Sequence, residues 1–375
     1  MENIYALFGG GGTGGHVIPA LAVAEELVGR GVERDMIRFV GSARGIDETL
    51  VGQRSFGFDG LSGRGIQRSM RPRAFLANIR STVGLVGGIF TGIRLVQRYR
   101  PQIVVSMGGY ASFATSIGAI VWRVPLVLME QNAKAGAANR AVRWFSMASA
   151  TSFSNTDLPR QVVTGNPVRA EILAVDRHRD RAIARQTLGL RSDSFVVAVA
   201  CGSLGARRVN TAIYALAELW AARTDVEIYH VIGRRDFAAT NAEQTRSASG
   251  DLSYHAVEFE SRMALLYSSA DVIVGRAGGT TMAEIAVIGV PAIAVPLPIA
   301  PRDHQRANAV AMGGGVVLVD DGDCTAHRLA EVLTELQKTP GLLAKMSTES
   351  QAKGHVDAAA KVADLLAQCA RTDRS

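Results

Sequence analysis

The sequence predicts an α/β protein built from two Rossmann-like domains. Short apolar runs of strand length alternate with helical patterns along most of the chain, as expected for parallel sheets covered by helices. The same opening, an apolar strand followed by a glycine-rich turn and a helix, occurs near residue 9 and again near residue 201. A length of 375 residues provides enough chain for two domains of ordinary size.

The first glycine turn extends from Gly9 to Gly15 and leads directly into His16. It follows an apolar run, Ile4 to Phe8, and precedes a helical pattern, Ala20 to Val28. Glycines allow the main chain to approach a ligand closely, and a helix N-terminus attracts anionic groups. We therefore expect a ligand at this turn, with the histidine in the pocket that the glycines open.

Two common nucleotide-binding motifs do not fit this turn. The glycine spacing matches a dinucleotide fingerprint, but the second predicted strand, Ile37 to Val40, ends in Gly41-Ser42 instead of the acidic residue that would hold a ribose. A Walker loop needs a Lys-Ser or Lys-Thr pair after its glycines, and none follows here. The turn is thus predicted to be neither an NAD site nor a Walker loop.

The overall charge indicates an anionic partner. The net charge is +7, and basic proteins usually meet nucleic acid, a phosphate-bearing ligand or an anionic membrane. Nucleic acid is not expected, because the chain shows neither an aromatic-interleaved RNA motif nor a helix-turn-helix pattern. Three scattered cysteines favour a reducing compartment, and no signal peptide is expected because the N-terminus leads directly into a strand.

Two more turns of the N-terminal half follow predicted buried strands. The strand Ile103 to Ser106 leads into Met107-Gly108-Gly109-Tyr110, and the strand Pro125 to Met129 leads into Glu130-Gln131-Asn132. Turns at the carboxyl ends of parallel strands are where open α/β sheets bind ligands. Both turns are therefore candidate parts of the site.

A basic segment without any acidic residue, Arg64 to Arg100, lies between the predicted strands Ile37 to Val40 and Ile103 to Ser106. Its arginines are Arg64, Arg68, Arg71, Arg73, Arg80, Arg94, Arg98 and Arg100. Ser81 to Ile93 is uncharged, but as a helix it spans roughly 20 Å, too short for a hydrocarbon core of about 30 Å. The segment is either a buried helix with a basic flank or a peripheral membrane patch. Three glycines, Gly84, Gly87 and Gly88, argue against a rigid helix here.

The C-terminal half is predicted to begin near Gly165-Asn166-Pro167-Val168-Arg169. The charged stretch Asp176 to Arg185 is interpreted as a linker or a solvated helix. The strand Phe195 to Ala200 then leads into the second glycine turn, Cys201 to Ala206, and the strand Val226 to Ile232 follows. The repeated pattern predicts a ligand in a cleft between the two domains.

A third glycine turn, Arg276 to Glu284, follows the strand Val272 to Val274. Its carboxylate, Glu284, could accept two hydrogen bonds from a ribose, or it could form a capping box with Thr281. A proline-rich turn, Pro296 to Asn308, comes after the next strand, Ala292 to Val295. The last helix, about Val356 to Ala370, is expected to return to the first domain.

Together these turns resemble one family. The matching motifs, in chain order, are Gly11-Gly12-Thr13-Gly14-Gly15-His16-Val17, Met107-Gly108-Gly109-Tyr110, Glu130-Gln131-Asn132, Gly165-Asn166-Pro167-Val168-Arg169, Gly202-Ser203-Leu204-Gly205-Ala206, Arg276-Ala277-Gly278 to Glu284, and Asp303-His304-Gln305 with Asn308. In this order, and over nearly the whole chain, they are similar to the MurG family. Its members transfer N-acetylglucosamine (GlcNAc) from UDP-GlcNAc to the peptidoglycan precursor lipid I, giving lipid II.

The resemblance implies the GT-B fold, which has two Rossmann-like domains with an interdomain cleft. The N-terminal domain, residues 1–165, would bind the acceptor and the membrane, and the C-terminal domain, residues 166–345, would bind UDP-GlcNAc. A C-terminal helix, about 355–375, would pack back on the N-terminal domain. The partners implied are UDP-GlcNAc, lipid I and the anionic cytoplasmic face of the cell membrane, where the enzyme would be peripheral.

The resemblance also implies site residues. Those expected to bind UDP-GlcNAc are Thr13, Gly14, Gly15, Asn132, Arg169, Ser203, Gly279, Thr280, Thr281, Glu284, His304 and Gln305. Those expected to face the acceptor are His16, Gly108, Gly109 and Tyr110. Those expected at the membrane are Arg71, Arg73, Phe75, Leu76, Ile79, Arg80 and Trp122.

The reaction would invert the anomeric carbon, because the acceptor 4-hydroxyl attacks opposite the departing UDP. A base must take the hydroxyl proton, and His16 is the first candidate because histidine titrates in the working range. Glu130 is the rival base, and His16 could instead bind acceptor or phosphate without proton transfer. Helix N-termini and hydroxyl donors would stabilise the diphosphate, and we expect no cofactor and no required metal.

Three other functions remain open at this point. A related GT-B transferase could use another lipid acceptor, as diacylglycerol glycosyltransferases do, and the donor turns hardly separate the two. A UDP-sugar epimerase would need an acid cluster of its own, which we do not find in the sequence. A nucleotide-sugar sensor would not need His16, Glu130 and Gln305 together.

Overall fold

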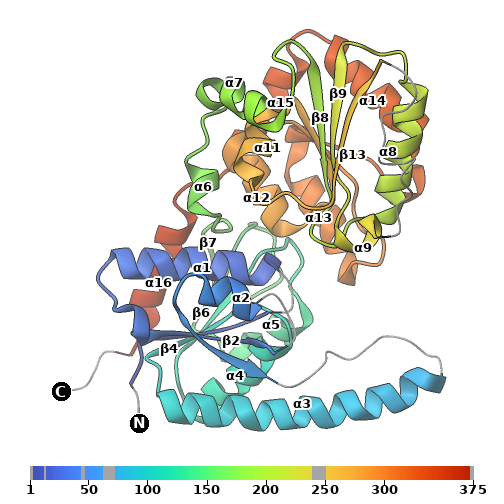
Figure 1. Ribbon diagram of the computed structural model, residues 1–375. Helices are drawn as coiled ribbons and strands as arrows, with labels where there is room; N and C mark the ends of the chain where they lie inside the picture. The colour runs from blue at the N-terminus through green and yellow to red at the C-terminus, as the bar shows by residue number, and fades with distance from the viewer. Residues whose placement is uncertain (1–2, 12–13, 44–46, 62–71, 239–250, 372–375) are drawn as a thin grey trace. The chain divides into compact units, whose positions relative to one another are not determined.

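The computed structural model describes residues 3–11, 14–43, 47–61, 72–238 and 251–371, with residues 72–85 described by their backbone only. The chain divides into two compact units (Figure 1). Unit 1 comprises Met1–Arg169 with Val356–Ser375, and unit 2 comprises Ala170–His355.

Unit 1 is built on a seven-stranded parallel sheet in the order β3-β2-β1-β4-β5-β6-β7. Its strands are β1 (Ala6–Gly9), β2 (Ile37–Ser42), β3 (Gly57–Leu61), β4 (Ile103–Ser106), β5 (Leu126–Glu130), β6 (Ala148–Thr151) and β7 (Gln161–Val163). The strand order reverses between β1 and β4. Ligands of open α/β sheets bind at such a switch point, outside the carboxyl ends of the strands.

Helices cover both faces of this sheet. They are α1 (Gly14–Gly29), α2 (Asp47–Gly52), α3 (Pro72–Tyr99), α4 (Tyr110–Val121), α5 (Ala137–Val142) and α16 (Ala358–Cys369), with 3-10 turns at η1 (Arg34–Met36) and η2 (Arg143–Phe145). Alternate side chains of each strand point to opposite faces, so Phe8 packs with α1 and α16 while Leu7 packs with α3 and α4. The C-terminal helix α16 thus completes the core of unit 1, beside α1 (Figure 1).

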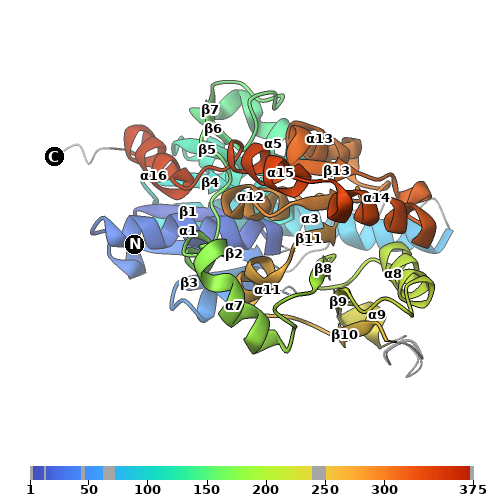
Figure 2. The same cartoon turned by 90° about the horizontal axis from the view of Figure 1, so that it is seen from above.

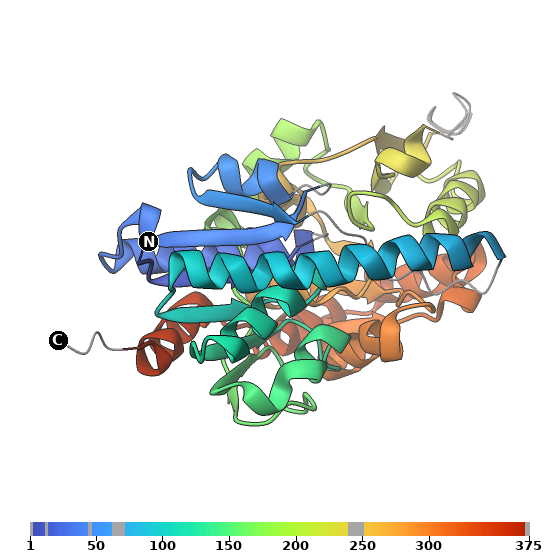
Figure 3. The same ribbon diagram turned by 90° about the horizontal axis from the view of Figure 1, so that it is seen from below.

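From Pro72 onward, where the structure describes it, the basic segment forms a single helix, which corrects the expectation that its glycines argue against a rigid helix. Helix α3 runs from Pro72 to Tyr99 without interruption and packs on α4 (Figure 3). Two glycines lie at this contact: a Cβ on Gly92 would lie 2.5 Å from the Ala114 carbonyl oxygen, and a Cβ on Gly88 would lie 1.5 Å from the Tyr110 hydroxyl. These glycines therefore allow two helices to approach closely.

Unit 2 repeats the plan with a six-stranded parallel sheet in the order β10-β9-β8-β11-β12-β13. Its strands are β8 (Phe195–Ala200), β9 (Val226–Val231), β10 (Ser253–Val257), β11 (Val272–Gly275), β12 (Ala292–Ala294) and β13 (Val316–Leu318). The order reverses between β8 and β11. The second glycine turn follows β8, and the third glycine turn follows β11. Each unit therefore carries glycine turns at its own switch point.

The helices of unit 2 form two layers around its sheet (Figure 2). They are α6 (Ala170–Leu173), α7 (Arg177–Leu188), α8 (Arg207–Leu219), α9 (Arg234–Phe237), α11 (Met263–Ser269), α12 (Gly279–Ile288), α13 (His304–Ala311), α14 (Ala326–Lys338) and α15 (Leu342–Gln351), with 3-10 turns at η3 (Pro301–Asp303), η4 (Gly313–Gly315) and η5 (Asp321–Asp323). Helices α8 and α14 pack together on one face, and α7 packs on α11.

Helix α7 decides between the two interpretations of Asp176 to Arg185: the stretch is a helix and not a linker, and the solvent covers only part of it. Asp176 caps it by accepting hydrogen bonds from the backbone N–H groups of His178 and Arg179. Its last arginine, Arg185, is 3% exposed and forms an ion pair of 2.8 Å with Asp271. The charges of this stretch thus face the protein as well as the solvent.

Candidate functional site

The first glycine turn places His16 in the first turn of α1. The His16 Nδ1 atom lies 3.3 Å from the Gly11 carbonyl oxygen. The other edge of the ring lies over the β4–α4 turn, because a Cβ on Gly108 would be 3.3 Å from His16 Nε2. Both Gly108 and Gly109 have positive φ, 92° and 86°, so glycine is needed at these two positions for its backbone and for the space it leaves.

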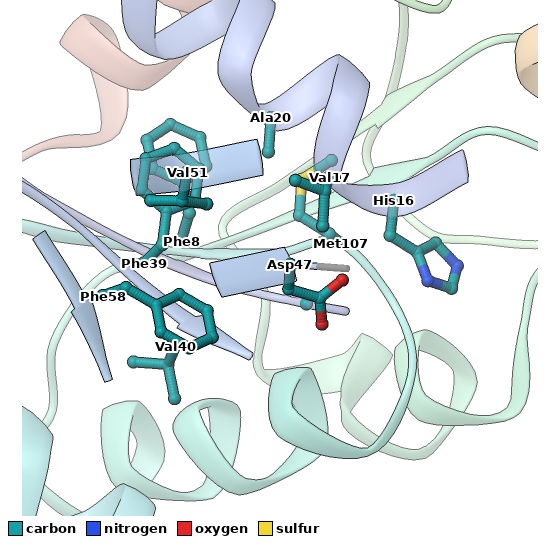
Figure 4. A pocket seen from close by; sticks show the side chains of 11 residues that line it. Phe8, His16, Val17, Ala20, Phe39, Val40, Asp47, Val51, Phe58 and Met107 are labelled. Atoms are coloured by element: carbon teal, nitrogen blue, oxygen red, sulfur yellow. The ribbon is translucent and has the colours of Figure 1, made fainter. Parts of the chain in front are cut away.

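A small cavity lies behind the turn, with His16 and Asp47 among its lining residues (Figure 4). Asp47 is 1% exposed, and its Oδ2 accepts a hydrogen bond of 3.2 Å from the Ser42 backbone N–H. A Cβ on Gly11 would lie 2.2 Å from the same oxygen. A buried carboxyl group therefore lies against Gly11 of this turn.

Tyr110 begins helix α4 directly after this pair of glycines. Its hydroxyl lies against Gly88 of α3, and burial raises the pKa of Tyr110 above its ordinary value. The expected acceptor residues His16, Gly108, Gly109 and Tyr110 are thus neighbours within unit 1.

Glu130 is held more tightly than the sequence could indicate. It ends β5 and is 4% exposed. Its Oε1 accepts hydrogen bonds from the backbone N–H and the side-chain amide of Asn132, at 3.2 and 3.1 Å. Its Oε2 accepts from the Gly136 backbone N–H and the Asn139 amide, at 2.9 and 3.0 Å. Four donors therefore occupy the carboxylate, which shapes the turn that carries Asn132.

The remaining donor-site residues of the N-terminal half are spread over two places. Gly14 and Gly15 are the first two residues of α1, whereas Thr13 lies outside the described residues. Arg169 ends the first of the two segments of unit 1, directly before α6.

The second glycine turn connects β8 to α8 in unit 2. Gly202 and Gly205 have positive φ, 85° and 82°. A Cβ on Gly205 would lie 2.1 Å from the Ile232 carbonyl oxygen, so this turn packs directly on the end of β9. Ser203 is exposed between the two glycines, and its carbonyl oxygen accepts a 3.0 Å hydrogen bond from the Arg234 backbone N–H.

The third glycine turn shows that the capping-box alternative for Glu284 is wrong. The N-cap of α12 is Gly278, so Thr281 lies inside the helix and cannot be its cap residue. Glu284 is 5% exposed, and its Oε2 accepts a 2.9 Å hydrogen bond from the Tyr267 hydroxyl. Tyr267 belongs to α11, and no pattern in the sequence predicts that these two side chains meet.

One amide side chain closes the proline-rich turn on itself, and another holds it to the rest of unit 2. Gln305 accepts a 2.9 Å hydrogen bond from the Leu297 backbone N–H, and the Asn308 amide donates to the Ala277 carbonyl oxygen at 3.0 Å. Two consecutive residues before His304, Arg302 and Asp303, have φ of 57° and 53°. Left-handed backbone at two side-chain-bearing residues is strained, and such strain clusters at binding sites.

Arg276 and an Asp-x-Asp triplet were missed as site candidates. The Arg276 guanidinium donates to the Val295 and Pro296 carbonyl oxygens, each at 3.1 Å, and to Asp321 Oδ1 at 2.6 Å. Asp321-Gly322-Asp323 has a spacing that could hold a metal, but this ion pair occupies Asp321. Among the described residues, no group of three or more His, Cys, Asp or Glu side chains is placed to hold a metal ion.

The expected membrane residues are only partly described. Arg71 is outside the described residues, and Arg73, Phe75, Leu76, Ile79 and Arg80 lie in the part of α3 known by its backbone only. Trp122 is 42% exposed, and its indole N–H donates to the Ile93 carbonyl oxygen of α3 at 3.2 Å. In the described part of the chain, no helix has both the length and the apolar character needed to cross a membrane.

Comparison with known proteins shows to which class of enzymes the chain belongs. Residues 6–151 match the Glycosyltransferase family 28 N-terminal domain, and residues 196–362 match the Glycosyltransferase family 28 C-terminal domain. A crystal structure of MurG from Acinetobacter baumannii has a TM-score of 0.73 at 26% identity, and the similarity covers 98% of this chain and 100% of that chain. Two parallel-sheet units with glycine turns at their switch points are therefore those of a GT-B glycosyltransferase.

A relative from Acidothermus cellulolyticus shows which family of glycosyltransferases the chain belongs to. It is 34% identical over 375 residues, 99% of each chain, and is named UDP-N-acetylglucosamine--N-acetylmuramyl-(pentapeptide) pyrophosphoryl-undecaprenol N-acetylglucosamine transferase. The chain belongs to this family of transferases. A UDP-GlcNAc 2-epimerase from Neisseria meningitidis has a TM-score of 0.65 at 16% identity, covering 98% of this chain and 100% of that one, and it shares the fold alone.

Proposed function

We propose that this enzyme transfers GlcNAc from UDP-GlcNAc to the 4-hydroxyl of MurNAc in undecaprenyl-diphosphate-MurNAc-pentapeptide, converting lipid I to lipid II for peptidoglycan synthesis. The observation that carries this proposal is the full-length similarity to relatives whose name states this transfer. An epimerase is less well supported, because the likeness to an epimerase concerns the fold alone. A diacylglycerol glycosyltransferase is less well supported, because the name of the full-length relative states a pyrophosphoryl-undecaprenol acceptor.

Unit 2 would bind the donor. In this proposal the Glu284 carboxylate binds the ribose hydroxyls, held in place by the Tyr267 hydroxyl at 2.9 Å. The N-terminus of α12, with Gly279, Thr280 and Thr281, would bind the diphosphate through backbone N–H groups and hydroxyls. Those donors would also stabilise the negative charge that develops on UDP as it leaves.

The remaining donor contacts would come from both units. Ser203, Arg169, His304 and Gln305 would complete donor binding, with Gln305 contacting the sugar hydroxyls. Asn132, Thr13, Gly14 and Gly15 would be the contacts from unit 1. Gly108, Gly109 and Tyr110 would contact the acceptor together with His16.

His16 would be the general base, acting through Nε2. The Gly11 carbonyl oxygen, 3.3 Å from Nδ1, favours the tautomer that carries its proton on Nδ1. The Nε2 lone pair is then available to take the proton of the attacking hydroxyl. Glu130, the rival base, would have to give up one of its four hydrogen bonds to do so. We therefore propose that Glu130 positions the Asn132 turn.

A comparison of pH–rate profiles tests this assignment. We expect His16→Ala to lower kcat by at least about 100-fold, the contribution typical of a general base. Near-normal turnover of His16→Ala would refute the assignment, and an acidic limb that disappears in Glu130→Gln but persists in His16→Ala would transfer the role to Glu130.

The enzyme would act as a peripheral protein at the cytoplasmic face of the membrane, where its polyprenyl-linked acceptor lies. Two exposed apolar side chains of α3, Val86 and Phe90, support this proposal together with Trp122. Arginines Arg71, Arg73 and Arg80 of the acid-free segment would bind anionic headgroups. Flotation with liposomes tests it: charge reversal at these three arginines should abolish binding to anionic vesicles, and unchanged binding would overturn the proposal.

The transfer itself is tested with purified protein, radiolabelled UDP-GlcNAc and a lipid I analogue. We expect label to appear in the lipid fraction only when the acceptor is present. Absence of labelled lipid with wild-type protein that binds UDP-GlcNAc would overturn the proposed function.

A further inference from the structure

A buried hydrogen-bond network in unit 1 connects the turn beneath His16 with the turn that carries Asn132. Its centre is Asn139 of α5, which is 0% exposed. The Asn139 amide donates to Glu130 Oε2 at 3.0 Å and to the Met129 carbonyl oxygen at 3.2 Å. Its Oδ1 accepts a 2.7 Å hydrogen bond from the Ser106 hydroxyl. One side chain thus touches the ends of both β4 and β5.

The network continues from Ser106 to the glycines of the β4–α4 turn. The hydroxyls of Ser106 and Ser112 are hydrogen-bonded to each other, and Ser112 Oγ accepts a 3.1 Å hydrogen bond from the Gly108 backbone N–H. Because the Ser106 proton points to Asn139, the Ser112 hydroxyl must be the donor to Ser106. Every donor in this series of hydrogen bonds therefore points the same way, from Gly108 through Ser112, Ser106 and Asn139 to the Glu130 carboxylate.

This common direction gives the network its strength. Hydrogen bonds that run in one direction polarise one another, and the carboxylate at the end makes the last ones charge-assisted. The same carboxylate accepts the backbone N–H and the amide of Asn132. A shift of either turn therefore breaks a buried bond of the other.

We propose that Asn139 is a positioning residue for the transfer: it fixes the Gly108 turn beneath His16 and the Asn132 turn in a single relative arrangement. The inference rests on the proposed roles of His16 and Asn132. Its consequence is that removing one network bond displaces groups at both turns, although Asn139 itself touches no substrate.

Two buried serines of the same sheet provide a matched test. Ser106 and Ser149 are both 0% exposed, and each donates one 2.7 Å hydrogen bond, Ser106 to Asn139 and Ser149 to the Pro159 carbonyl oxygen. Ser106→Ala should lower the melting temperature at least as much as Ser149→Ala, because it also removes the acceptor of the Ser112 hydroxyl. We expect kcat to fall on the order of 10-fold or more in Ser106→Ala, since small displacements of catalytic groups are costly, and to stay within about twofold in Ser149→Ala.

The variant Asn139→Asp gives a second readout that a merely structural role would not produce. A protonated Asp at 139 can still donate to Glu130 and accept from Ser106, whereas an ionised one places two carboxylates side by side. Such pairs share a proton, so the pKa of one member rises. We expect the kcat of this variant, divided by that of the wild type, to rise about tenfold or more as the pH falls from 8.5 to 5.5.

The outcomes separate the two proposals. If the wild type does not transfer GlcNAc to lipid I, the proposed function fails. If it does, and Ser106→Ala keeps the kcat of Ser149→Ala, the positioning role of Asn139 is refuted. A pH-independent ratio for a folded Asn139→Asp variant would refute it as well, and the serine pair decides the question if that variant does not fold.

Discussion

Replacing Arg185 by methionine should destabilise unit 2 strongly, because this guanidinium joins α7 to the rest of the unit. Arg185 donates to Asp271 Oδ2 at 2.8 Å and to the Ser269 carbonyl oxygen at 3.1 Å. It also donates to the carbonyl oxygens of three residues just before β8, namely Arg191, Ser192 and Ser194. Methionine has a similar length and none of these donors.

The expected magnitude follows from what the substitution leaves behind. Breaking a buried ion pair by removing one partner costs about 3–5 kcal/mol. Asp271 keeps a second partner, since Arg181 also contacts it, so we expect a value near the lower end, about 3 kcal/mol. A unit of this size loses roughly 2–4 °C of melting temperature per kcal/mol, which gives about 6–12 °C.

Arg179 provides the control on the same helix. Its side chain is 67% exposed and is paired with the neighbouring Asp180, so Arg179→Met should change stability by less than about 0.5 kcal/mol. Thermal melting followed by circular dichroism compares the two variants with the wild type. If Arg185→Met melts within about 2 °C of Arg179→Met, the anchoring role of Arg185 is refuted.

Three further predictions concern the site and its supports. Glu284→Gln should raise KM for UDP-GlcNAc about tenfold or more with little change in kcat, since a hydrogen bond to a charged group contributes about 1.5–3 kcal/mol; steady-state kinetics would contradict the ribose assignment if KM is unchanged. Gly88→Ala should lower the melting temperature, because its Cβ would lie 1.5 Å from the Tyr110 hydroxyl, whereas Gly87→Ala, which meets no atom within 4 Å, should raise it. Equal shifts of the same sign in these two variants would show that the α3–α4 contact is misjudged. Burial lowers the pKa of His230 to about 3. Between about pH 6.5 and pH 3 the unfolded state therefore binds a proton at this histidine and the folded state does not, so the free energy of unfolding should fall as the pH drops through this range. Urea unfolding of His230→Gln should depend less on pH in that window, and an unchanged slope would show that another group controls it.

The strand–turn–helix pattern was sufficient to predict most of the fold. Glycine turns after apolar runs located the ends of β1, β8 and β11. In the first two turns the glycines Gly11, Gly202 and Gly205 have positive φ, which side-chain-bearing residues rarely adopt. The sequence could not predict how Asp176 to Arg185 packs, since a charged stretch looks solvated until its buried partner is known. That partner, Asp271, lies 86 residues from Arg185.

The site was predicted less completely than the fold. His16, Gly108 and Gly109 lie together as expected, since they follow neighbouring strands of one sheet. The partner of Glu284, Tyr267, lies on another helix 17 residues upstream, and no spacing pattern connects the two. The four hydrogen bonds to Glu130 could not be predicted from the sequence either. Two of their donors are backbone N–H groups, and only the geometry of the turn directs them toward the Glu130 carboxylate.

Acceptor selectivity distinguishes the transfer of GlcNAc to lipid I from transfer to another lipid. Initial rates of UDP release from UDP-GlcNAc should be measured with the lipid I analogue, with diacylglycerol and without acceptor, on wild-type enzyme and on His16→Ala. We expect rapid release by the wild type with the lipid I analogue alone, together with a lipid product one GlcNAc heavier. Equal or faster release with diacylglycerol, or no GlcNAc-bearing product from lipid I, would contradict it.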